Sequence, residues 1–462
     1  MNLNFYKKKP ALEVNPSESE FQQRKRYKRL RWQTFLAATI GYSFYYVSRT
    51  GLNVVKKPIL ESGILDTKQL GYIGSALLFT YAIGKFVNSF LADHSNIRRF
   101  MATGLIVSAC ANLIVGILGL MNSNIGSTTN LFLMSFILLW GINGWSQSMG
   151  AGPSIVSLSR WFPKKERGTY YGFFSASHNF GEFLSFIFVG LIVSLVGWQW
   201  GFVSAALAGA VGVIVIVFFM HDSPESKALP SLEKLSNERE EKKTEVSKTQ
   251  IEVLKNPYVW VLAFSSAFMY ISRYAINGWG VLFLQEHKGF SLEMATRIIS
   301  INALLGIIGT IVSGWFSDKL FKGSRNVPAL IFGVLNTVSL SLFLLSGDSL
   351  WINVLSMVLF GIAIGVLICF LGGLMAIDIV PRNASGAALG IVGIASYIGA
   401  GIQDVISGYL IDKHKTYSGM LNGVEQYDYN FTTVGMFWIG ASIVSFVLAV
   451  LVWNAKQKVK EQ

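Results

Sequence analysis

The sequence predicts an all-α membrane protein with twelve transmembrane helices in two parallel six-helix halves. Two observations lead to this fold class. The first is composition: 52% of the 462 residues are hydrophobic and only 14% are charged, whereas soluble domains carry about 25% charged residues. The second is patterning, because the apolar residues fall into runs of roughly 20 residues, the length that an α-helix needs to cross a bilayer.

The apolar runs divide into two sets of six, separated by a stretch rich in Lys, Glu and Ser. The first half, 32–220, has expected spans near 33–55, 69–91, 100–120, 130–155, 169–194 and 200–220. The second half, 257–454, has expected spans near 257–284, 296–318, 328–346, 351–378, 386–411 and 432–454. The remaining segments are a basic cytosolic arm over 1–31, a cytosolic linker over 221–256 and a cytosolic tail over 455–462.

The net charge of +13 does not indicate a nucleic-acid partner, because Lys and Arg lie in short loops between apolar runs. Such loops face the cytosol in membrane proteins. Basic residues occur in alternate loops and in the linker, whereas the loops at 121–130, 195–200 and 346–351 contain none. Lys56, Lys57, Lys288 and the pair Lys413 and Lys415 oppose this pattern but are outnumbered. We therefore predict a multi-pass protein of the bacterial cytoplasmic (inner) membrane with both termini in the cytosol.

An internal repeat supports the division into halves. Tyr46 to Asn53 and Tyr270 to Asn277 share the pattern Tyr-x-Ser-Arg-x-x-x-Asn, and their arginines are 224 residues apart. Asp93 and Asp318, which follow the next span of each half, are 225 residues apart. A constant offset of this kind indicates parallel repeats related by an axis along the membrane normal.

The repeated arginines, Arg49 and Arg273, are the main candidates for a binding site. An arginine at the centre of a spanning helix costs about 2.5–3.5 kcal/mol on insertion scales, so such a residue indicates function. Each lies roughly 16 residues, or about 24 Å, into its span, so both are expected at one level. Two guanidinium groups facing one cavity repel each other unless an anion lies between them, and their planar donors suit a phosphoryl group. The alternative is that each arginine pairs with a carboxylate, of which Glu182 and Asp404 are candidates.

Further polar residues are expected along the same cavity. Some share a helix face with an arginine or with one another, because residues three or four apart are neighbours on a helix. His178 is the least certain of them, since a lone buried histidine is often a packing residue, but near neutrality it could gain charge as an anion binds. The candidates are Tyr42, Tyr46, Tyr81, Lys85, Gln147, His178 and Tyr270.

Two loop motifs and two negative predictions complete this inventory. Asp93 with Arg98 and Asp318 with Arg325 are predicted gating contacts or helix caps at the cytosolic face. Cys110 lies in an apolar run, as does the second cysteine, and no pattern of metal ligands accompanies them. Neither a nucleophile motif nor a phosphate-binding loop is evident, so the sequence does not indicate an enzyme, a cofactor or a metal.

Several motifs together resemble one known family. They are Gly41-Tyr42 to Arg49, Tyr81-x-x-x-Lys85, Gly144-Trp145-Ser146-Gln147, Arg167-Gly168, Ser177-His178-Asn179-Phe180-Gly181, Asp222-Ser223-Pro224-Glu225-Ser226, Asn256-Pro257-Tyr258-Val259-Trp260 and Tyr270 to Trp279. The chain resembles, from about residue 29 to 453, the organophosphate:phosphate antiporters of the major facilitator superfamily, and within them the hexose-phosphate transporters and their sensor paralogue. The segment Asp318-Lys319-Leu320-Phe321 with Arg325 is similar to the sensor and glucose-6-phosphate branch.

The resemblance implies exchange of inorganic phosphate for a hexose phosphate, glucose 6-phosphate above all, by alternating access. It assigns the phosphoryl group to Arg49 and Arg273, further cationic contacts to Lys85 and His178, and a place in the cavity lining to Tyr397. A monomer in the lipid bilayer is expected. The alternatives are a glycerol-3-phosphate:phosphate antiporter and a membrane sensor of external hexose phosphate that acts on a signalling partner. The chain departs from the family pattern at Thr50, Ser175, Glu182, Gly278 and the segment 365–368.

Overall fold

The computed structural model describes residues 3–14, 16–122, 130–236, 253–321, 325–380, 385–421 and 423–452, except for the side chains of a few of them. Three predictions fall wholly or partly outside this description: the tail over 455–462, residues 237–252 of the central linker and the side chain of Asp318.

The first six long helices follow one another with short connections. They are α1 (Glu20–Glu61), α2 (Thr67–His94), α3 (Ile97–Asn122), α4 (Asn130–Trp161), α5 (Lys164–Val196) and α6 (Trp198–Phe219). A capping box at Ser19 begins α1 and another at Asp66 begins α2, which satisfies amide groups that the helices leave free. The short η1 (Leu3–Tyr6), η2 (Glu225–Lys227) and α7 (Leu232–Ser236) lie outside this group.

The second set of long helices has one interruption. It comprises α9 (Pro257–Glu286), α10 (Leu292–Leu320), α11 (Asn326–Leu345), α12 (Leu350–Cys369), α14 (Ser385–Lys413) and α15 (Thr432–Leu451). The helix that begins as α12 passes through one π-helical turn, η3 (Phe370–Leu374), into α13 (Met375–Asp378). A hairpin of β1 (Lys415–Leu421) and β2 (Val424–Tyr429) connects α14 to α15 and was not predicted.

Ten of the described helices are long and apolar enough to cross a membrane. The other two long helices, α1 and α4, pack among them, and their 42 and 32 residues also exceed the thickness of a bilayer. The low mean hydropathy of α1 reflects the basic residues at both of its ends, which extend well beyond the predicted span of 33–55. The all-α membrane fold is confirmed.

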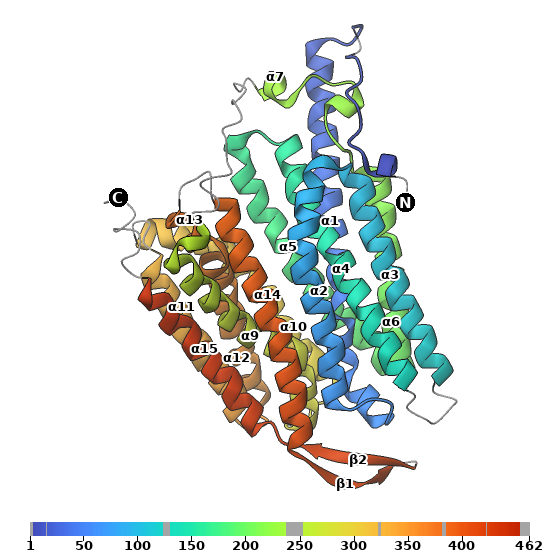
Figure 1. Cartoon of the computed structure of the whole chain (residues 1–462), viewed down its shortest axis with the longest axis vertical. Coiled ribbons are helices and arrows are strands. Elements are labelled where there is room, and N and C mark those ends of the chain that lie inside the picture. The colour runs from blue at the N-terminus through green and yellow to red at the C-terminus, as the bar shows by residue number, and fades with distance from the viewer. Residues whose placement is uncertain are drawn as a thin grey trace.

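The helices pack in two groups, α1 to α6 and α9 to α15, which meet where α2 packs against α14 and α5 packs against α10 (Figure 1). Glycine residues permit this close approach, because they have no side chain. A Cβ atom at Gly71 would lie 2.6 Å from the carbonyl oxygen of Asp404, and one at Gly190 would lie 2.8 Å from the hydroxyl of Thr296. The exact domain boundaries remain predictions.

The two groups are closed against each other at the end that carries the β-hairpin (Figure 1). Lys57 of α1 forms an ion pair with Glu286 of α9 at 2.8 Å. Gln426 of the hairpin donates from its amide nitrogen to the carbonyl oxygen of Glu61 at 3.4 Å. The hairpin of the second group thus covers the end of α1 in the first group.

Two of the basic residues that opposed the orientation pattern are not loop residues exposed to water. Lys56 lies inside α1 and is buried. Lys288 is also buried and donates to the carbonyl oxygen of Phe343 at 2.5 Å and to the side-chain oxygen of Asn353 at 2.7 Å. Placing Lys56 in a loop was wrong, whereas Lys288 does lie in the loop between α9 and α10 but is buried there among specific partners. They therefore do not argue against the predicted orientation, which remains a prediction.

The N-terminal arm is held against the first helix group by hydrogen bonds. Asp222, just after α6, accepts hydrogen bonds from the amide of Lys9 at 3.0 Å and the amide of Ile97 at 3.1 Å, and pairs with Arg160 at 2.5 Å. The carbonyl oxygen of Tyr6 accepts from the amide of Asn96 at 2.7 Å. This buried carboxylate holds the arm against the turn between α2 and α3.

Candidate functional site

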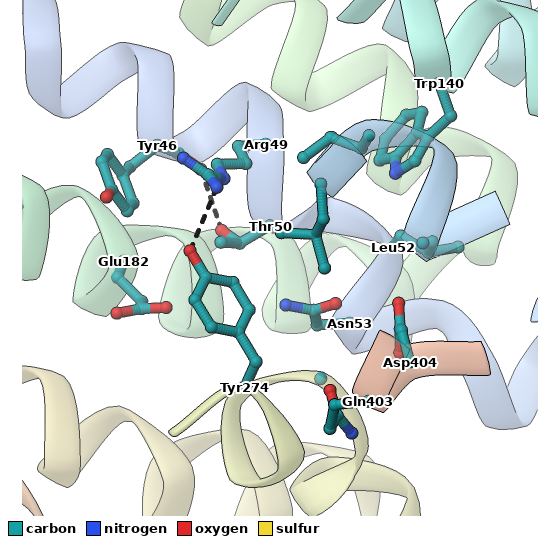
Figure 2. Close-up of a pocket in the computed structure, with 14 residues that line it drawn as sticks. Tyr46, Arg49, Thr50, Leu52, Asn53, Trp140, Glu182, Tyr274, Gln403 and Asp404 are labelled. Carbon is teal, nitrogen blue, oxygen red and sulfur yellow. Dashed lines mark hydrogen bonds between the residues drawn. The ribbon is translucent and has the colours of Figure 1, made fainter. Parts of the chain in front are cut away.

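Arg49 and Arg273 lie at corresponding positions of α1 and α9, and both are buried, with 5% and 3% of their surface exposed. A guanidinium nitrogen of Arg49 donates to the hydroxyl of Tyr274 at 3.0 Å, which links the two helices (Figure 2). The same guanidinium lies 4.2 Å from the ring centre of Tyr81. Stacking on an electron-rich ring stabilises a cation in surroundings that exclude water. The first arginine is therefore surrounded by aromatic groups.

Arg273 has a carboxylate partner, contrary to the expectation that both arginines would be unpaired. Its guanidinium lies 3.4 Å from Glu182 of α5, and the amide of Asn277 donates to the other oxygen of the same carboxylate at 2.8 Å. The alternative prediction is thus correct for Arg273. The repulsion between the arginines is reduced in this state, because one of the two positive charges is compensated.

The predicted tyrosines gather around the arginines. The rings of Tyr81 and Tyr397 lie 4.5 Å apart, and those of Tyr270 and Tyr397 lie 5.3 Å apart. Tyr42 and Tyr46 form a similar pair at 5.6 Å. These five tyrosines and the two arginines form a cage whose residues come from α1, α2, α9 and α14, helices that are distant in sequence.

Tyr274 belongs to this cage and was not among the candidate residues. Its ring stacks on that of Tyr270 at 5.8 Å, and its hydroxyl is the partner of Arg49. The sequence contains one signal that could have found it: Tyr274 occupies, in the second repeat, the position that Thr50 occupies in the first.

The other two predicted cations lie at the edge of the cage. The ammonium of Lys85 lies 5.2 Å from the ring centre of Tyr397. The His178 ring lies 5.7 Å from that of Tyr46, and its Nε2 atom is buried without a hydrogen-bond partner in the part of the chain that the structure describes. Such an atom could accept or donate a hydrogen bond once a ligand enters.

Gln147 points into a different network. Its amide donates to the hydroxyl of Ser108 at 2.7 Å and to the side-chain oxygen of Asn143 at 3.4 Å. Asn143 in turn donates to the carbonyl oxygen of Ser48, beside Arg49. Gln147 is therefore linked through Asn143 to the backbone of α1 beside Arg49 and is not recorded in contact with the arginines.

The predicted gating residues make contacts within one helix group. Asp93 is exposed, and its carbonyl oxygen accepts from Arg160 at 2.9 Å. Arg98 donates to the carbonyl oxygen of Val217 at 3.4 Å. Arg325 pairs with Asp378 at 3.0 Å, which joins α11 to α13. A gating role remains a prediction, since none of these recorded contacts joins the two helix groups in this state.

A small pocket extends from Arg49 and Tyr274 to the carboxylate of Asp404 (Figure 2). Its free volume is about 30 Å³, room for roughly two water molecules. The pocket is too small for a phosphorylated sugar, so ligand entry requires the cage to open. The lining includes Tyr46, Arg49, Thr50, Glu182, Tyr274, Gly278, Gln403 and Asp404.

A second cluster comprises Lys56, Asp404 and Trp279, from three different helices. The ammonium of Lys56 lies 3.6 Å from the carboxylate of Asp404 and 3.4 Å from the ring centre of Trp279. The indole nitrogen of Trp279 donates to the same carboxylate at 2.6 Å. The sequence pattern does not reveal this cluster, because Lys56 stands beside Lys57 at the end of an apolar run, a position typical of a loop.

Long apolar helices in two groups, with a buried cationic site where the groups meet, define a membrane transporter rather than an enzyme. The family comparison agrees: the model of the Major Facilitator Superfamily matches residues 38–403. The chain belongs to this superfamily and is an integral membrane protein.

Curated relatives specify the family further. The "Probable hexose phosphate transport protein" of Chlamydia trachomatis is 30% identical over 459 residues, covering 94% of this chain and 93% of the relative. The "Glycerol-3-phosphate transporter" of Bacillus subtilis is 31% identical and covers 99% of both chains. The "Membrane sensor protein UhpC" of Salmonella typhimurium is 31% identical, covering 87% of this chain and 89% of the relative. These relatives confirm the resemblance to the organophosphate:phosphate antiporter family.

Solved structures agree on the fold. A bacterial homologue of the human lysosomal transporter Spinster, in an inward-facing and unoccupied conformation, matches with a TM-score of 0.71 at 17% identity. The match covers 94% of this chain and 98% of that one.

Proposed function

We propose that this chain carries phosphate esters across the membrane, exchanging a hexose phosphate, glucose 6-phosphate above all, for inorganic phosphate. The observation that supports it is the meeting of Arg49 and Arg273, from matching positions of the two repeats, in one buried cage. Planar guanidinium groups bind phosphoryl oxygens in a bidentate manner. The relatives named for hexose phosphate, glycerol 3-phosphate and phosphoglycerate have phosphorylated molecules in common.

The mechanism we propose is alternating access. A phosphoryl group would displace the Tyr274 hydroxyl from Arg49 and compete with Glu182 for Arg273, drawing α1 and α9 together through the ligand. Lys85 and the free Nε2 atom of His178 would contact the remaining oxygens, and the tyrosines would line the sugar. A ligand shifts such an equilibrium only by its differential affinity for the two states. Binding is therefore strongest in the state where both arginines reach the same phosphoryl group.

The test is a substrate panel in phosphate-loaded proteoliposomes that contain the full chain. Uptake of radiolabelled phosphate is measured in competition with glucose 6-phosphate, glycerol 3-phosphate and free glucose. We expect strong inhibition by glucose 6-phosphate, weaker inhibition by glycerol 3-phosphate and none by glucose. Equal inhibition by glucose and its phosphate would contradict the phosphoryl clamp.

A sensor of external hexose phosphate is the second candidate, because a relative of similar identity carries that description. A sensor needs the same ligand cage but no exchange, and it needs a signalling partner. Binding of glucose 6-phosphate without phosphate exchange in the same proteoliposomes would favour this function.

A further inference from the structure

We propose that Glu182 makes this protein a proton-coupled carrier, in which a phosphoryl dianion enters the site together with one proton on the Glu182 carboxylate. Net uptake driven by a pH gradient would then accompany exchange. This inference rests on the proposed function, since it concerns the same site.

The geometry places Glu182 in direct competition with the substrate. Its carboxylate is 3% exposed and contacts the guanidinium of Arg273 and the amide of Asn277 with its two oxygens. A phosphoryl group that binds Arg273 must either replace this carboxylate or share the guanidinium with it. The carboxylate therefore occupies, in the empty site, part of the place of the anion.

The charged and titratable groups around Glu182 come mainly from two helices. Arg273 and Tyr274 face it from α9, and Arg49 and Tyr46 line the same pocket from α1. His178 lies one turn earlier on α5, and Asp404 of α14 lines the far side of the pocket, paired with Lys56. The segments 198–219 of α6 and 298–317 of α10 contain no titratable residue, and Glu293, in the first turn of α10, is exposed.

The charge balance explains why a proton should accompany the ligand. A phosphate monoester carries about −1.5 to −2 charges at pH 7, and two buried arginines can compensate such a dianion. An ionised Glu182 leaves only one net positive charge between the two arginines and repels the ligand. Protonation of one carboxylate oxygen removes both obstacles. Because the coupling between two binding events is reciprocal, a ligand that binds more tightly to the protonated site also raises the affinity of the Glu182 carboxylate for a proton.

The contacts in the empty site allow the carrier to return across the membrane without a ligand. With only two uncompensated arginines, an empty site would return slowly, and exchange would be obligatory. Here the Arg273–Glu182 pair and the Arg49–Tyr274 hydrogen bond satisfy the site without a ligand. After the dianion and the proton leave on the far side, the ionised Glu182 can pair with Arg273 again. The carrier can then return without phosphate, which permits net transport.

The experiment uses proteoliposomes without internal phosphate, with the membrane potential clamped at zero by potassium and valinomycin. We expect the wild-type chain to accumulate radiolabelled glucose 6-phosphate when the outside is more acidic, and a protonophore to abolish this accumulation. For one proton per dianion, a gradient of one pH unit supports up to about tenfold accumulation of the dianion. Wild-type exchange without gradient-driven uptake would overturn the proton coupling and leave the exchange proposal intact.

The wild-type experiment cannot tell whether the proton travels on Glu182 or on the phosphoryl group itself. A dianion accompanied by a proton and a protonated monoanion give the same net flux, so a variant of Glu182 is needed. Glu182→Gln mimics the protonated carboxylate permanently, so it should exchange phosphate at an altered rate but lose gradient-driven accumulation. Glu293→Gln, an exposed carboxylate on α10, is the matched control and should retain the accumulation. Accumulation by Glu182→Gln equal to the wild type would show that the proton travels on the ligand, contradicting the role of Glu182. Absence of both exchange and uptake in the wild type would instead reject the proposed function.

Discussion

At the residue scale, the pair of Lys56 and Asp404 shows how this structure stabilises charge inside the membrane. Lys56 is 1% exposed, and it has both a carboxylate and an indole ring as partners. The two residues belong to different helix groups, α1 and α14. The pair therefore stabilises the state that is closed at the hairpin end.

We predict that Lys56→Met destabilises the protein by about 3–5 kcal/mol, because it leaves the buried Asp404 carboxylate without its counter-charge. Thermal unfolding of the purified protein in detergent measures this loss as a lower Tm. The double variant Lys56→Met with Asp404→Asn should recover much of the stability. A double variant that is no more stable than Lys56→Met would contradict the pairing.

At the element scale, α2 and α14 approach each other through their backbones. A Cβ atom at Gly408 would lie 2.5 Å from the carbonyl oxygen of Thr67, and one at Gly71 would lie 3.3 Å from the Cα atom of Gly408. A backbone contact cannot move aside as a flexible side chain can. Any larger residue here must separate the two helices at the hairpin end.

We expect Gly71→Leu to abolish transport while leaving the protein folded, because α2 and α14 can then no longer close. Uptake in proteoliposomes measures the loss. Accessibility of the pocket provides a second measurement, with Asn53→Cys introduced in a background without Cys110 and Cys369. This cysteine should react faster with an impermeant maleimide, added at the hairpin side, when Gly71→Leu is present than when Gly71 is retained. Gly440→Leu, at a position with open space around it, is the control and should transport normally. Normal transport by Gly71→Leu would refute the proposed closure.

At the scale of the whole molecule, the β-hairpin and the N-terminal part of α1 lie at opposite ends of the bundle (Figure 1). The distribution of basic loops predicts that the α1 end faces the cytosol. The hairpin then lies on the outside, and the closed end of the bundle is the external one.

This orientation predicts two labelling results in spheroplasts, again without the native cysteines. Tyr417→Cys, exposed on β1, should react with an impermeant maleimide in intact spheroplasts. Lys25→Cys, exposed on α1, should react only after permeabilisation. The opposite pattern would reverse the predicted orientation of the chain in the membrane.

The sequence was sufficient to predict the helical class, the repeat and the two arginines, because buried charges and apolar periods are local patterns. It could not show that Arg273 pairs with Glu182, since helix packing selects one of several available carboxylates. The burial of Lys56 and the role of Tyr274 likewise depend on which helices meet. The hairpin was missed because its polar residues resemble an ordinary loop.

The central claim is that Arg49 and Arg273 together bind the phosphoryl group, and phosphate exchange by Arg49→Lys tests it most directly. Lysine keeps the charge but loses the planar pair of donors, and hydrogen bonds to charged groups contribute about 1.5–3 kcal/mol each. We therefore predict that counterflow of radiolabelled phosphate in proteoliposomes falls by roughly tenfold to a hundredfold. Counterflow by Arg49→Lys at the wild-type rate would contradict the clamp.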